Sequence, residues 1–212
     1  MKDSMRPSES WQHALPNAVI GFEAAVSDAG AKAPGITGEI KNGTVAEVLD
    51  LMVATDRRYT YAEPMPGVIE VRPKIENREL AAILTLAVPE ARIEAQDWPQ
   101  NIIMHVAGFL PQLGQYLRAR EMAWSRSIGR PLPGRAGSIL SSDAPIPEVS
   151  VAVRDTTVRG ALDAIAAYTQ EHGSKTMPYN PWAPPTGWRV DFRPDAEAST
   201  GLGGYVSWAP FP

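Results

Sequence analysis

The sequence predicts an α+β protein of two related βαββ modules, each a mixed sheet with one packed helix, joined by a central helix and a proline-rich linker. The main observation is an internal repeat: residues 36–54, ITGEIKNGTVAEVLDLMVA, align without a gap with residues 149–167, VSVAVRDTTVRGALDAIAA. Each copy passes from an alternating strand into a helix that opens on threonine, and each later reaches a strand ending in Arg-Pro. A repeat of this kind favours two small units of similar fold.

Composition narrows the class of protein. The chain has 212 residues, 44% hydrophobic and 21% charged, which is typical of a globular protein. Its net charge of −4 argues against a dedicated nucleic-acid binder, because phosphate backbones require a basic surface. No apolar run is long enough to span a membrane as a helix. The absence of cysteine excludes disulfides and thiolate metal sites.

The first module is expected over residues 16–75. An additional edge strand is expected at 18–23, with the start of a helix as the alternative. The repeat strand is expected at 36–41, where apolar and polar residues alternate. The helix that follows begins after Thr44, which forms a capping box with Glu47 three positions on.

A hairpin completes this module. Residues 59–62 and 68–72 read as its two strands, and Pro66-Gly67 is a turn signal between them.

Residues 76–129 connect the modules. They are expected to hold a short strand at 84–88 and an amphipathic helix that begins near Pro99. Pro111 should kink or break this helix, because proline removes a backbone donor and clashes with the preceding turn. Residues 130–147, rich in proline and glycine, read as an exposed linker.

The second module is expected over residues 148–212. Valines alternate at 149–154, and the hydroxyl of Thr157 or the carboxylate of Asp155 should cap the next helix. Its return strand, 188–193, lies further from the helix than in the first copy, because a proline-rich segment with aromatic residues is inserted before it.

The succession of strand, Thr-Val-x-x-x-Leu-Asp helix and hairpin resembles the secretin and TonB short N-terminal domain of bacterial envelope proteins. The resemblance is carried by 40–50 with 67–73, and by 153–163 with 187–194. It implies a non-catalytic module that contacts partner proteins or signalling peptides. It further implies a periplasmic or extracellular protein whose signal peptide is missing from this sequence, with the cytoplasm as the alternative. Neither a secretin pore region nor a TonB-dependent barrel accompanies the motif, so the resemblance points to a free-standing relative.

One candidate binding surface is aromatic. Exposed aromatic side chains on rigid turns make good interface anchors, because little conformational entropy is lost on binding. The residues concerned are Tyr179, Trp182, Trp188 and Trp208. The alternative interpretation is that proline-tryptophan turns simply cover a small core.

A second candidate surface is basic. Five arginines lie close together at the end of the central helix and in the linker: Arg118, Arg120, Arg126, Arg130 and Arg135. Such a patch would suit an anionic polymer, an acidic protein face or a membrane surface. Cations at a helix C-terminus followed by a solvated linker are the ordinary explanation.

No catalytic or metal-binding motif is present. The histidines His13, His105 and His172 lack a ligand-like spacing, and no serine occurs in a nucleophile motif. Asp50 and Asp163 recur at equivalent positions of the two copies, as ligand contacts or as ordinary hydrogen-bonding groups at a helix. We therefore expect no catalytic residue, no metal and no cofactor.

The sequence favours a non-catalytic protein- or peptide-binding module of the bacterial cell envelope. Open sheet edges on small modules are one way of recruiting a partner strand. A carbohydrate-active or hydrolytic enzyme that uses Asp and Glu in a groove between the modules is a rival hypothesis. A structural oligomer subunit is another, and the sequence leaves the oligomeric state open.

Overall fold

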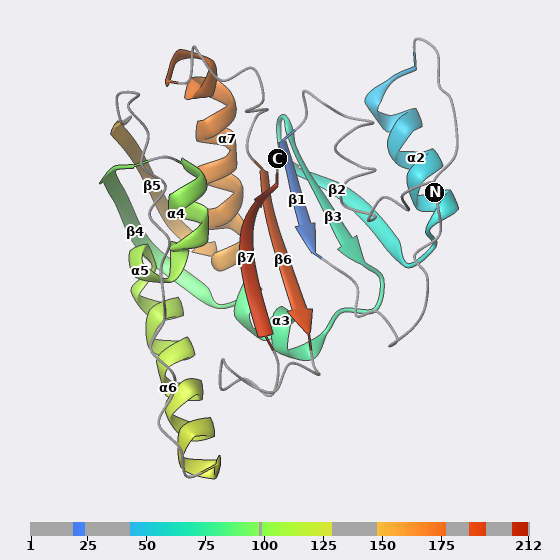
Figure 1. The fold of residues 1–212 in the computed structure, drawn as a ribbon. Helices are drawn as coiled ribbons and strands as arrows, with labels where there is room; N and C mark the ends of the chain where they lie inside the picture. Colours follow the sequence, from blue (N-terminus) through green and yellow to red (C-terminus); the bar gives the residue numbers. More distant parts are fainter. Residues whose placement is uncertain are drawn as a thin grey trace, which may run out of the picture.

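The protein is described by a computed structural model that covers residues 19–23, 43–97, 99–128, 148–176, 187–193 and 205–211. Its α+β class is confirmed: helices pack around a mixed five-stranded sheet and a two-stranded antiparallel sheet (Figure 1). Among the described residues, no helix is long and apolar enough to cross a membrane.

The larger sheet has the strand order β2-β3-β1-β6-β7. Its central strand β1, Val19–Glu23, runs parallel to β3, Val68–Pro73, and to β6, Gly187–Arg193. The outer strands β2, Tyr59–Met65, and β7, Tyr205–Phe211, pair antiparallel with β3 and β6. The strand expected at 18–23 is therefore present, but its expected place at an edge is wrong.

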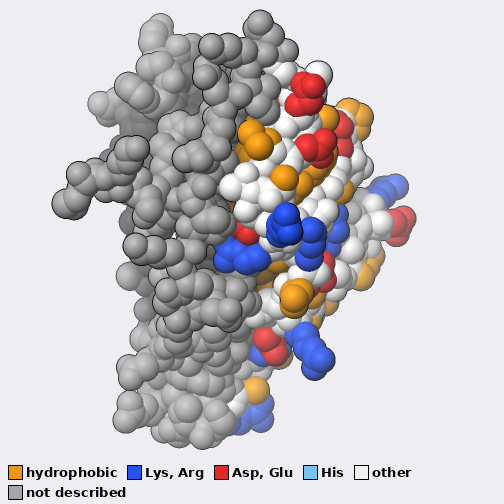
Figure 2. Space-filling model, turned by 90° about the vertical axis from the view of Figure 1, so that its right-hand side faces the viewer, with side chains coloured by type: hydrophobic (Ala, Val, Ile, Leu, Met, Phe, Trp, Pro, Cys, Tyr) orange, Lys and Arg blue, Asp and Glu red, His pale blue; other side chains and the backbone are white. Residues whose placement is uncertain are grey.

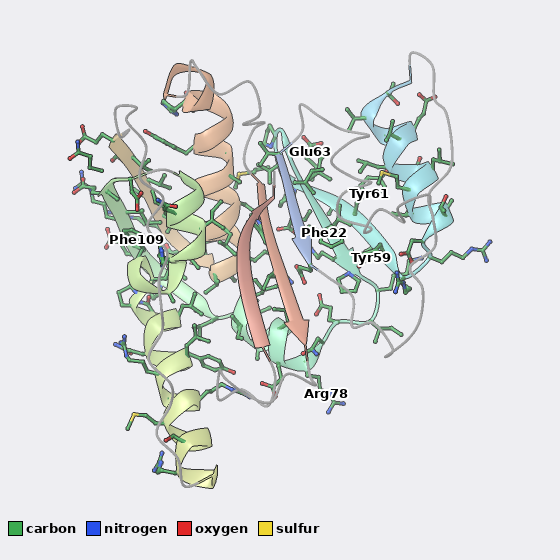
Figure 3. All side chains as sticks on the ribbon, viewed as in Figure 1. Phe22, Tyr59, Tyr61, Glu63, Arg78 and Phe109 are labelled. Carbon is green, nitrogen blue, oxygen red and sulfur yellow. The ribbon has the colours of Figure 1, made fainter. Side chains whose placement is uncertain are left out.

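All five residues of β1 are buried, because both faces of the sheet are covered. On one face Ile20 and Phe22 contact α2, Val45–Thr55, through Leu49 and Met52. The rings of Phe22 and Tyr59 lie 5.3 Å apart in this core (Figure 3).

The N-terminus of α2 has the expected capping box. The backbone N–H of Glu47 donates to the Thr44 hydroxyl at 3.3 Å, and the backbone N–H of Thr44 donates to the Glu47 carboxylate at 2.7 Å. The hairpin is confirmed as well, with Gly67 at φ 80° in the turn between β2 and β3. This positive φ suits glycine, which has no Cβ to clash.

On the opposite face lies α7, Val158–Thr176, which is sandwiched between the larger sheet and the smaller one (Figure 1). The Thr157 hydroxyl accepts a hydrogen bond from the backbone N–H of Gly160 at 3.3 Å, as one of the two expected caps. Because the helix is covered on two sides, its buried residues form a broad apolar surface: Val158, Ala161, Leu162, Ile165 and Ala166.

The smaller sheet is a ribbon of two long strands. β4, Ala87–Gln96, pairs antiparallel with β5, Glu148–Thr157, with Ile93 opposite Val151. The short strand expected at 84–88 is wrong in both length and position. Its first residue instead ends a helix that the sequence reading missed, α3, Arg78–Leu84, whose N-cap is Asn77.

The central helix is divided into three pieces: α4, Pro99–Met104, α5, Val106–Phe109, and α6, Pro111–Ile128. The break expected at Pro111 is confirmed, and a second break lies at His105. Pro111 becomes the first residue of α6, where its missing N–H is no loss. In Figure 1, α6 extends away from the rest of the described elements.

The strand pairing corrects the expected division into two modules with a sheet each. β5 pairs with β4, which lies between the repeats, whereas β6 and β7 join the sheet of the first module through β1. The two strands that lead into Arg-Pro, β3 and β6, flank β1 on either side. The strand expected at 36–41 and the linker expected at 130–147 lie outside the described residues.

Candidate functional site

Charged side chains are buried between the larger sheet and α7. Glu23 on β1, Glu70 on β3 and Asp163 on α7 are exposed by only 2%, 2% and 1%. Arg72 on β3 and Arg159 on α7 lie among them. We refer to these five residues as the buried ion cluster.

Each arginine of the cluster holds one glutamate. Arg159 donates from Nε to Oε1 of Glu23 at 2.7 Å, and its Nη2 lies 3.8 Å from Oε1 of Glu76. Arg72 forms an ion pair with Glu70. Burial raises the pKa of Glu23 above its ordinary value, although the hydrogen bond and the charge of Arg159 oppose this effect.

Asp163 is held in a different way. The indole Nε1 of Trp188, on β6, donates a hydrogen bond to its Oδ1 at 2.7 Å. Burial, followed by the hydrogen bond and the negative charge of Glu70, raises the pKa of Asp163 to about 8. The carboxyl group therefore retains its proton at neutral pH, which reduces the charge buried in the cluster.

Gly21 provides the space for this arrangement. It lies beside Trp188 in the sheet register, and a Cβ at this position would come 2.6 Å from Cε2 of the indole. Only a residue without a side chain leaves room for the ring beside β1, where it reaches Asp163.

The geometry of the cluster suits a structural role. It joins α7 to three strands of the larger sheet by charged or polar hydrogen bonds, and its carboxylates are closed to solvent. A hydrolytic site needs acid and base groups that a substrate can approach. The carboxylates of the buried ion cluster therefore do not support the rival hypothesis of an enzyme with accessible Asp and Glu.

Among the predicted aromatic anchors, Trp188 is not exposed, so this prediction is wrong. It is fully buried and bonded to Asp163, so it is part of the core rather than an exposed interface residue. Trp208 lies on β7 opposite Val190, at a position where only the backbone is described. Tyr179 and Trp182 lie outside the described residues.

The basic patch is divided by the structure. Arg118 and Arg126 are exposed on α6. Arg120, by contrast, is half-buried: its Nη2 lies 2.5 Å from Oε2 of Glu79, and its guanidinium lies over the ring of Tyr116. Arg120 is thus occupied within the fold, because its charge is already paired. Two further members of the predicted patch, Arg130 and Arg135, lie outside the described residues.

The recurring aspartates have analogous partners. Asp50 on α2 accepts a hydrogen bond from the Tyr61 hydroxyl at 2.8 Å, and Asp163 on α7 accepts one from the Trp188 indole. In each case an aromatic donor from a following strand binds the helical aspartate (Figure 3 labels Tyr61). The interpretation as ordinary hydrogen-bonding groups therefore fits both, although Asp163 is buried and Asp50 exposed. Within the described parts of the chain, no group of side chains is arranged to hold a metal ion.

Figure 2 shows the side that carries α2 and β2, where acidic, basic and hydrophobic side chains are interspersed over the described part.

The smaller sheet offers a different candidate site. On the β4-β5 ribbon, β5 has β4 along one edge, and no strand of the described residues pairs with the other. We call this second edge the β5 edge.

The outer face of the ribbon is charged and exposed. On β5 it consists of Glu148, Ser150, Ala152 and Arg154, which alternate with buried valines. Arg154 donates to Glu90 on β4 at 3.0 Å, whereas Arg92 and Glu94 pair along β4 at 2.7 Å. Pairs as exposed as these add little stability, so these side chains are available to other partners.

Sequence reasoning missed Glu23, Glu70 and Arg159. Each is a charged residue in or beside a run of apolar ones, a position that reads as solvent-facing when its partner is unknown. One signal was present: Glu70 occurs within Val-Ile-Glu-Val, an otherwise apolar run on a strand of the expected hairpin. A charge on a strand buried on both faces needs a buried partner.

Comparison with protein-family models, curated proteins and solved structures found no match to this chain. The functional interpretation therefore depends on the geometry of the described residues.

Proposed function

We propose that this protein is a non-catalytic binding module that takes up a strand of a partner protein or peptide along the β5 edge. The observation that carries the proposal is a ten-residue strand with one buried face, one exposed face and one edge to which no described strand pairs. The backbone N–H and C=O groups along such an edge are a template for an added strand.

The β5 edge suits strand addition better than the other strand edges. β4 contains Pro89, which lacks an N–H group, and β7 contains Pro210. β2 contains Pro64, and its register shifts between Ala62 and Met65. Proline and bulges are devices that protect sheet edges from pairing. β5 contains no proline, and its irregular residue Asp155 lies near its C-terminal end, so the edge of residues 148–154 lacks this protection.

The compartment follows from the sequence resemblance alone. We place the protein in the periplasm or outside the cell, because short N-terminal domains of that kind act at the bacterial envelope. Fractionation of the native host, with an antibody against this chain, tests the placement. Recovery of the protein solely with cytoplasmic markers would contradict it.

Strand addition can be tested with a displayed library of ten-residue peptides whose alternate positions are restricted to Val, Ile or Thr. Retained peptides should slow amide hydrogen exchange along β5, because an added strand supplies acceptors to its outward N–H groups. The amides of β4 serve as the internal control and should change less. If no peptide is retained, or if retained peptides protect other elements instead, the proposal fails.

A further inference from the structure

The following inference rests on the proposed function, because it names the partner strand. We infer that the β5 edge takes up β5 of a second copy of this chain, in an antiparallel pair with its two-fold axis at Val151. The result is a continuous four-stranded sheet in the order β4-β5-β5-β4.

The backbone defines which part of β5 is regular enough to pair. Asp155 has a φ of 46°, in the left-handed region, which interrupts the extended strand. The strand begins at Glu148, so its regular part is 148–154. The middle residue of this part is Val151, and a two-fold axis there gives the longest overlap between two copies.

The alternation of side chains restricts the register further. Successive residues of a strand point to opposite faces, so only registers that shift by an even number of residues keep the buried faces of both copies on the same side. Val149, Val151 and Val153 point to the core. With the axis at Val151, Val149 lies opposite Val153 of the second copy, and the apolar layer continues across the pair.

Charge selects among the remaining registers. The axis at Val151 places Glu148 opposite Arg154 of the second copy, and symmetry repeats this pair. Moving the axis to Ala152 places Arg154 opposite Ser150, whereas moving it to Ser150 places Glu148 opposite Ala152; neither pairs opposite charges. Directly opposite residues of unlike charge stabilise a strand pair, and those of like charge destabilise it.

The charges already present on the ribbon agree with this register. Arg154 extends across the ribbon to Glu90 at 3.0 Å and is 77% exposed, so it can contact a second carboxylate. The Glu148 carbonyl accepts a hydrogen bond from the Tyr168 hydroxyl at 3.1 Å. A carbonyl oxygen has two lone pairs, so this bond does not saturate it.

The inference is tested by sedimentation equilibrium on the whole chain at neutral pH and low salt, with folding checked by circular dichroism. The unsubstituted protein should show a concentration-dependent dimer. Glu148→Arg and Arg154→Glu each create two like-charge contacts and should weaken the dimer at least about tenfold. An equimolar mixture of the two variants should form a heterodimer, because both contacts then pair opposite charges again.

Arg92→Glu is the matched control. It reverses a charge on the same outer face, but on β4, where Arg92 is 72% exposed and pairs with Glu94 of its own strand. This variant should dimerise as the unsubstituted protein does. An equal loss in Arg92→Glu, or a mixture of the two β5 variants that remains monomeric, would overturn the inference.

The two proposals fail in different ways. If the unsubstituted protein stays monomeric while library peptides still protect β5 from exchange, the second copy is the wrong partner and strand addition stands. If it stays monomeric and no peptide protects β5, both proposals are wrong. A dimer through β5 should compete with the library peptides for the same edge.

Discussion

The indole Nε1 of Trp188 donates a hydrogen bond to Oδ1 of Asp163 at 2.7 Å, between two fully buried side chains on β6 and α7. The bond joins the strand and helix of the second repeat inside the molecule. Because its donor is neutral, it does not compensate a buried negative charge as an arginine would. The proton retained by Asp163 removes that need at neutral pH.

We expect the stability of the protein to fall as the pH rises toward and through 8. The folded-state pKa of Asp163 is about 8, and that of an unfolded aspartate is about 3.9. Between these two pH values the folded protein therefore binds more protons than the unfolded chain. The stabilisation that results is fully present below the unfolded-state pKa and is lost as the pH rises through the folded-state pKa. Asp163→Asn should flatten the slope of unfolding free energy against pH by up to about 1.4 kcal/mol per pH unit.

Asparagine is suited to this test because its Oδ1 still accepts from Trp188 and its amide can donate to Glu70. Urea unfolding at a series of pH values from 5 to 9 measures the slope. Asp50→Asn is the matched control, since Asp50 occupies the equivalent repeat position but is exposed and bonded to Tyr61. An unchanged slope in Asp163→Asn would show that Asp163 ionises normally in the folded protein.

Gly21→Ala should destabilise the protein by about 1–3 kcal/mol, because the new methyl group overlaps the indole of Trp188. Trp188→Phe should be destabilising by itself, since it leaves a cavity and removes the donor to Asp163. In the double variant, Gly21→Ala should destabilise the protein less than it does alone, because the indole that it overlaps is gone. A double-mutant cycle of thermal unfolding measures this difference. Strictly additive effects would contradict the contact.

Arg159→Met should destabilise the protein by about 3–5 kcal/mol, because it leaves the carboxylate of Glu23 buried without its cation. The loss should diminish as the pH falls, since protonation of Glu23 removes the uncompensated charge. Chemical unfolding at pH 5 and pH 8 measures both effects. Arg118→Met on exposed α6 is the control and should change stability by less than about 0.5 kcal/mol. Similar losses in both variants would count against a buried ion pair.

Thr44→Ala should lower the free energy of unfolding by about 1 kcal/mol, because it removes the N-cap of α2. Hydrogen bonds from the backbone and the hydroxyl of Thr44 lower the pKa of Glu47. The contribution of Glu47 to folding stability is therefore present above its unfolded-state pKa. It is lost as the pH falls through the lower pKa of the folded state. Thermal unfolding near neutral pH measures the effect. Thr55→Ala, which removes a hydroxyl bonded to the Leu51 carbonyl of the same helix, should cost less.

Elements with local signals were predicted well. The capping box of α2, the Pro-Gly turn between β2 and β3 and the break at Pro111 each depend on residues within a few positions of one another. The helix α3 is missed from the sequence, because its first turn follows an asparagine cap with no capping box and its last residue, Leu84, falls in the strand expected at 84–88. β4 was predicted too short, since the alternation that begins at Ala91 is out of phase with Val88: two exposed residues, Pro89 and Glu90, separate them.

The sequence by itself determined where the repeat helices begin and that alternating valines at 149–154 form a strand with one buried face. Tertiary structure alone decided that this strand pairs with β4 and that β6 returns to β1. Alternation specifies which face of a strand is buried, but any strand with a matching apolar face satisfies it. For the same reason Glu23, Glu70 and Asp163 read as surface residues. The fold brings Arg159 to Glu23 from α7 and Trp188 to Asp163 from β6, whereas Arg72 pairs with Glu70 on the same strand, β3.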